Sequence, residues 1–140
     1  MTKKAREWMS DPIALKFIEK YIVHYQDVTS GDYLLFWTQL NDFARVSEEF
    51  RTAKASLLYQ KFIKKNAYRE VNFITDEQRN RIEALLAEAM QENAKAISQD
   101  IFEEIMDETE SLLIQRVFKS FNGSVFYREY KEAVLLSSNL

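Results

Sequence analysis

With 140 residues, the chain is long enough for one domain with a sizeable core but not for two. It is 46% hydrophobic and 14% aromatic, which excludes a disordered segment, and its two glycines and one proline are too few for an all-β fold. The net charge of −3 argues against a nucleic-acid-binding surface. Together, these three features predict an all-α domain without a nucleic-acid partner.

The first predicted helix begins at Asp11 and Pro12, a residue pair suited to the first turn of a helix. Its apolar residues recur every three or four positions and form one face: Ala14, Phe17, Ile18, Tyr21, Ile22 and Tyr25. Residues 28–31 interrupt this pattern. The helix predicted next, at about 32–46, is apolar nearly all round and is therefore expected to be central. A further helix is expected at about 49–65.

Residues 66–75 have no helical period and are expected to form a loop. Thr75 and Gln78 then match a capping box, which predicts a helix start. The expected helix carries its apolar residues on one face: Ile82, Leu85, Leu86, Ala89 and Met90.

A third long stripe comprises Ile101, Phe102, Ile105, Met106, Leu112, Leu113 and Val117, and a last helix carries Phe126, Tyr130 and Val134. We therefore expect a single domain over residues 1–140, with about eight to nine helices. Its core should extend from about residue 11 to 135. The first eight or so residues and the tail after Ala133 are expected to be frayed.

The inventory of catalytic residues is thin. One histidine, His24, cannot supply a histidine pair, and the isolated Gly31 and Gly123 do not make a phosphate-binding loop. The carboxylates of Glu103, Glu104, Asp107, Glu108 and Glu110 fall largely between apolar positions, as on a solvated helix face. We therefore expect no cofactor, no metal and no catalytic residue.

Localisation follows from several absences in the sequence. There is no cysteine, which agrees with a reducing compartment, and no apolar run reaches the roughly 18 residues that span a bilayer. Lys3, Lys4, Arg6 and Trp8 are suited to touch anionic lipid, but the stretch is too short to anchor the chain alone. We expect a cytoplasmic protein without stable membrane insertion, open to peripheral recruitment at the inner face of the plasma membrane. The small basic group Lys61, Lys64, Lys65 and Arg69 is either solvated or meets an acidic partner.

Three short patterns point to a known family. Phe36-Trp37 lies in the central predicted helix, Ala55 is followed by Leu58-Tyr59, and Glu70-Val71-Asn72 places Asn72 thirteen positions after Tyr59. Residues 121–127 add the pattern Phe-x-x-Ser-x-x-Tyr. From about Asp11 to Tyr130 the chain resembles the regulator of G-protein signalling (RGS) homology domain. The aromatic residues Phe36, Trp37, Tyr59 and Phe62 are interpreted as core packing.

The resemblance implies an all-α bundle that binds the switch regions of a GTP-bound heterotrimeric G-protein α subunit. Members accelerate GTP hydrolysis by stabilising its transition state, and they supply no arginine finger because the α subunit carries its own. Such a protein is a GTPase activator, an inhibitor of signal transduction, rather than an enzyme itself. The implied partner-binding residues lie in three segments: Ser30, Asp32 and Tyr33; Glu70 and Asn72; and Leu112, Arg116, Val117 and Ser120.

The chain departs from the family pattern in two of these segments. Asp32-Tyr33 stands where the family usually has Glu-Asn. Without gaps, Arg116 aligns with the family's aspartate and Ser120 with its arginine, whereas a short insertion would instead make Arg116 the matching arginine. Two functions therefore stand: a GTPase-activating domain, which Asn72 favours, and an RGS-like interaction or scaffold domain without activating activity, which Tyr33, Arg116 and Ser120 favour.

Overall fold

The computed structural model describes the backbone of residues 3–138 and the side chains of residues 5–138. Over this range the fold is all-α, as predicted, with no strand. The helices are α1 (Lys3–Ser10), α2 (Pro12–His24), α3 (Val28–Phe43), α4 (Glu48–Leu58), α5 (Asp76–Ala89), α6 (Glu103–Leu113), α7 (Lys119–Phe121) and α8 (Val125–Ser138), with π-helical turns η1 (Tyr59–Ile63) and η2 (Ile114–Phe118). Because η1 continues α4, and η2 and α7 continue α6, residues 3–138 form seven continuous helical segments, fewer than the eight to nine expected.

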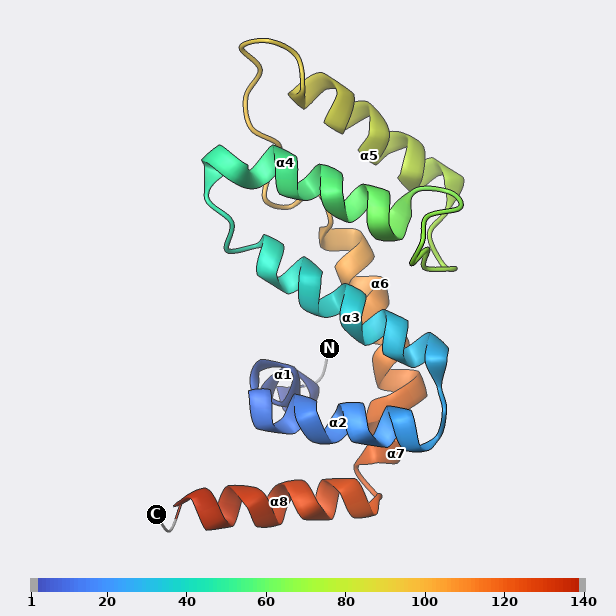
Figure 1. Cartoon of the computed structure of the whole chain (residues 1–140), viewed down its shortest axis with the longest axis vertical. Coiled ribbons are helices and arrows are strands. Elements are labelled where there is room, and N and C mark those ends of the chain that lie inside the picture. The colour runs from blue at the N-terminus through green and yellow to red at the C-terminus, as the bar shows by residue number, and fades with distance from the viewer. Residues whose placement is uncertain (1–2, 139–140) are drawn as a thin grey trace. The chain divides into compact units, whose positions relative to one another are not determined.

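The helices of the chain fall into two compact units (Figure 1). Unit 1 comprises Met1–Leu34 and Thr109–Leu140, and unit 2 comprises Leu35–Glu108. The helices α3 and α6 contribute residues to both units. The single domain expected over residues 1–140 stays a prediction.

In unit 1, α2 packs against α1 and α8, and the two longer helices run side by side in Figure 1. Trp8 of α1 is buried, with its ring centroid 5.3 Å from those of Phe121 and Tyr127. Trp8 is therefore a core residue, and the prediction that it touches lipid is wrong. The side chains of Lys3 and Lys4 lie outside the described residues.

Both ends of the described chain are helical, and the fraying expected there stays a prediction. Residues 3–10 form α1, which the Trp8 ring attaches to the core, and α8 continues to Ser138. Asp11 helps to hold both ends, since its Oδ1 accepts from the Ile13 amide at the start of α2 and its Oδ2 accepts from the Tyr130 hydroxyl at 2.8 Å. Residues 1–2 and 139–140 lie outside the described residues.

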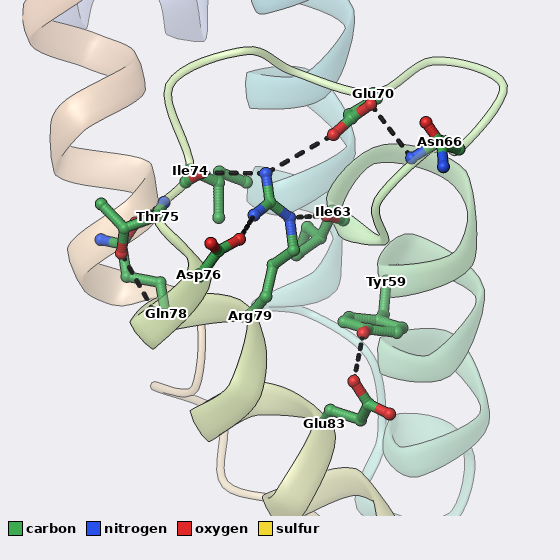
Figure 2. Close-up of polar contacts among 10 residues, drawn as sticks. All are labelled: Tyr59, Ile63, Asn66, Glu70, Ile74, Thr75, Asp76, Gln78, Arg79 and Glu83. Carbon is green, nitrogen blue, oxygen red and sulfur yellow. Dashed lines mark hydrogen bonds and ion pairs between the residues drawn. The ribbon is translucent and has the colours of Figure 1, made fainter.

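In unit 2, α4 packs against α5, and aromatic rings form much of the core. The Phe36 ring centroid lies 4.9 Å from that of Phe62, and the Phe43 centroid lies 5.1 Å from that of Phe102. Tyr59 is buried with its hydroxyl donating to Glu83 Oε2 at 2.8 Å (Figure 2). Phe36, Trp37, Tyr59 and Phe62 are thus core residues, as the sequence predicted.

Two helix starts show how local polar groups set the boundaries. The predicted capping box is confirmed: the Gln78 amide donates to Thr75 Oγ1 at 3.1 Å and Gln78 Oε1 accepts from the Thr75 amide at 3.0 Å. The interruption predicted at residues 28–31 is wrong, because Asp27 caps α3 there. Its Oδ1 accepts from the Ser30 amide, so the helix begins at Val28. Leu85 of α5 and Met90, which directly follows this helix, are exposed, although the sequence placed them on the apolar face with the buried Ile82 and Leu86.

Candidate functional site

The first candidate cluster, within unit 1, joins the start of α3 to η2 through Arg116. Arg116 Nε donates to Ser30 Oγ at 2.9 Å, and Arg116 Nη2 donates to Asp27 Oδ1 at 2.9 Å. The Ser30 hydroxyl also forms a short hydrogen bond with Asp27 Oδ2. Arg116, which is distant in the sequence, thus joins the neighbouring Asp27 and Ser30 in one polar group.

The charge of Asp27 is stabilised by this group. Partial burial by itself would raise the pKa of the Asp27 carboxyl, but hydrogen bonds from the Ser30 hydroxyl and amide and from Arg116 outweigh it and lower the pKa below its ordinary value. Asp27 is therefore ionised at neutral pH and balances the positive charge of Arg116. The guanidinium carbon of Arg116 also lies 5.7 Å from the centroid of the Tyr33 ring.

The second candidate segment is the loop of residues 64–75 in unit 2, which lies between η1 and α5. Arg79, near the start of α5, extends between Ile63 and Ile74 (Figure 2). Its Nε donates to the Ile63 carbonyl oxygen and its Nη2 to the Ile74 carbonyl oxygen, each at 2.9 Å. One guanidinium therefore bonds the backbone at both ends of the loop.

Two carboxylates complete the Arg79 contacts. Asp76 Oδ1 lies 2.6 Å from Arg79 Nη1, and Glu70 Oε1 lies 3.5 Å from Arg79 Nη2. The other Glu70 oxygen accepts from the Asn66 amide at 3.1 Å, where the backbone has a φ of 66°. Asparagine adopts this left-handed backbone conformation more readily than most other residues do. Glu70 thus connects Arg79 to Asn66, the loop residue with positive φ.

The backbone of the loop is also bonded to η1. The Arg69 amide donates to the Lys61 carbonyl and the Val71 amide donates to the Phe62 carbonyl, each at 3.0 Å. Within the loop, the side chains of Val71 and Ile74 are buried, whereas those of Tyr68, Arg69 and Asn72 are exposed. The loop therefore presents an aromatic, a cationic and an amide side chain on a fixed backbone.

The comparison with protein families decides what kind of module carries this loop. Residues 6–130 match the model of the regulator of G protein signaling domain. The chain belongs to the RGS domain family. That match spans residues of both units and agrees with the resemblance that Phe36-Trp37 and Glu70-Val71-Asn72 indicate. Curated proteins gave no match to this chain.

The RGS domain buries three of the nine residues predicted to bind a partner. Ser30 is 0% exposed, and Tyr33 and Val117 are also buried. Ser30 holds Asp27 and Arg116, and Tyr33 lies against Arg116. In this conformation the side chains of Ser30, Tyr33 and Val117 are therefore packed inside unit 1 and are not exposed to a partner.

The other six predicted residues are accessible to different degrees. Asn72, Arg116 and Ser120 are exposed, and Asp32, Glu70 and Leu112 are half-buried. Within unit 1 the structure brings Ser30, Tyr33 and Arg116 together, and within unit 2 it places Glu70 beside Arg79.

Sequence reasoning missed two residues of this RGS domain that organise the site, Asp27 and Arg79. Asp27 carried a usable signal, because an aspartate three positions before Ser30 is typical of a helix cap. Arg79 carried none, since its carbonyl partners lie 16 and 5 positions away and do not depend on side-chain identity.

The described residues show neither a metal-binding cluster nor a membrane-spanning helix. Among them, no group of three or more histidine, cysteine, aspartate or glutamate side chains is placed to hold a metal ion. Over the same part of the chain, every helix is too short or too polar to cross a membrane.

Proposed function

We propose that this RGS domain binds the switch regions of a GTP-bound heterotrimeric G-protein α subunit and accelerates its GTP hydrolysis. The observation that carries the proposal is the exposed Asn72 on a loop whose two ends are bonded to Arg79. Family membership supports a role in regulating G-protein signalling. The RGS domain would act as a GTPase activator and supply no catalytic residue of its own.

The proposed mechanism is positional. In α subunits the arginine that stabilises transition-state charge is supplied in cis, so a partner accelerates hydrolysis by holding the switch segments in their reactive geometry. Asn72 would contact the region of the α subunit's catalytic glutamine and orient it. In unit 2, Glu70 would contact the α subunit together with Asn72. In unit 1, Asp32, Leu112 and Ser120 would supply further contacts, whereas Ser30, Tyr33 and Val117 are buried in that unit.

A second candidate function is a scaffold that binds partners without accelerating hydrolysis. The observation that favours it is the commitment of Arg116 to Asp27 and Ser30 within the chain. If Arg116 stands where the family has aspartate, α subunits suited to ordinary members would meet a mismatched surface.

Binding to a panel of α subunits in the GDP, GTP-analogue and GDP–aluminium fluoride states would separate the two functions. An activator binds the GDP–aluminium fluoride state most tightly, because that state resembles the transition state. Equal binding to all three states would instead identify a scaffold. A cytoplasmic location fits either proposal. Because Trp8 is buried, recruitment to the inner face of the plasma membrane would occur through the partner.

A further inference from the structure

We infer that Arg79 is a positioning residue that sets the shape of the 64–75 loop before a partner arrives. The inference rests on the proposed function, since it assigns a role within the same docking surface. Arg79 would not touch the α subunit. Its effect on binding and on GTP hydrolysis would pass through the loop that carries Asn72.

The geometry of the guanidinium supports this role. The Arg79 side chain is only 14% exposed, and its hydrogen bonds run to the carbonyl oxygens of Ile63 and Ile74, which bracket the loop (Figure 2). A planar group with several fixed donors can bond two such oxygens at once. A lysine ammonium at this position would be a single point donor and would not reproduce both bonds with the same geometry.

The charges that pair with Arg79 come from its own unit rather than from a partner. Its two carboxylate neighbours, Asp76 and Glu70, belong to the same unit. Glu70 also accepts a hydrogen bond from the Asn66 amide. The cation is thus compensated within the chain. Its contacts hold the loop at Ile63 and at Ile74, and its contact with Glu70 extends to Asn66.

A loop held in this way lowers the entropic cost of binding. Ordering a flexible loop on association costs free energy that would be subtracted from affinity, and a loop already in its bound shape avoids that loss. Loss of the Arg79 restraint should therefore weaken binding and slow association, even though every residue of the contact surface is still present.

The test compares three variants of the chain. Arg79→Gln removes both the positive charge and the planar guanidinium with its several donors. Arg79→Lys keeps the positive charge but loses the planar guanidinium. Arg81→Gln is the matched control, because it makes the same charge change two positions along α5, where the side chain is 51% exposed and pairs with Glu104 at 3.1 Å.

Two quantities are measured on each variant. Hydrogen exchange of the Arg69 and Val71 amides reports loop opening in the free domain, with the Ile82 and Leu86 amides of α5 as an internal reference. Association rate and affinity are measured against an α subunit loaded with GDP and aluminium fluoride.

We expect Arg79→Gln to speed exchange of the two loop amides by about tenfold relative to α5 and to weaken binding by about tenfold. Arg79→Lys should show a large part of both effects, and Arg81→Gln should stay within about twofold of the wild type. Unchanged binding by Arg79→Gln would overturn the inference. Equal acceleration of loop and α5 amides in both Arg79 variants would also overturn it, because it would indicate a general loss of stability.

Failure of the proposed function would look different. If the wild-type domain binds no α subunit in any nucleotide state, that function is wrong. The exchange data then decide alone: faster exchange confined to the loop supports Arg79 as its organiser, and unchanged loop exchange overturns that role.

Discussion

The Arg116 guanidinium lies 2.9 Å from the Asp27 carboxylate, and the two residues are 89 positions apart in the sequence. Asp27 also caps α3, and the buried Ser30 hydroxyl bonds both partners. The cation of Arg116 therefore has a counter-ion within its own chain. Any change at Arg116 therefore also alters the contact between η2 and the start of α3.

The first prediction concerns this ion pair. Arg116→Asp should lower the free energy of unfolding by about 1 kcal/mol, because it places two carboxylates together at a partly exposed site. The charge-swapped variant that combines Arg116→Asp with Asp27→Arg should lose less stability than the sum of the two single variants, although Asp27→Arg also removes the cap of α3. Urea unfolding of the wild type, both single variants and the double variant gives the coupling energy. Strictly additive effects would show that the pair contributes nothing to stability.

The second prediction concerns Asn72. Asn72→Ala should reduce the acceleration of single-turnover GTP hydrolysis by an α subunit by about tenfold or more, with little change in melting temperature, because Asn72 is an exposed loop residue. Asn80→Ala, an exposed asparagine on α5, is the matched control and should leave both quantities unchanged. Full acceleration by the Asn72 variant would remove this residue from the mechanism.

The third prediction concerns the core. Trp37 is 5% exposed within α3, so Trp37→Ala should destabilise the fold by roughly 3–5 kcal/mol through lost burial and the cavity it leaves. Phe50→Ala serves as the control, because Phe50 is 60% exposed and its truncation should cost little. Thermal unfolding measures both. A shift of only a degree or two for the Trp37 variant would contradict its place in the core.

The fourth prediction concerns pH and the packing of α8. Burial, and then the hydrogen bond to Asp11, raises the pKa of Tyr130 to about 12 from its ordinary value of 10.0. Because the folded state favours the neutral phenol, its contribution is complete below pH 10 and is lost as the pH rises toward 12. Unfolding of the wild type should therefore become easier over this range. Tyr130→Phe should lose that part of the pH dependence, and an identical alkaline profile in the variant would contradict the assignment.

Local patterns in the sequence were sufficient to predict the helices from α2 onward and two of their starts, of which Asp11 with Pro12 indicated that of α2, but they did not predict α1. Apolar spacing indicated the helices, and Thr75 with Gln78 indicated the start of α5. The same kind of reasoning predicted a loop before α5 and placed Asn72 in it. These features depend on residues within about four positions of each other, which the sequence displays directly.

The tertiary structure alone decided which polar residues organise the site. The sequence showed Arg116 as a departure from a family pattern and did not single out Arg79, whereas the fold bonds Arg116 to Asp27 and Arg79 to the Ile63 and Ile74 carbonyls. It likewise buried Trp8, which by sequence resembled a lipid contact. The physical reason is that such contacts depend on the path of the backbone between distant residues, and carbonyl acceptors are present at every position.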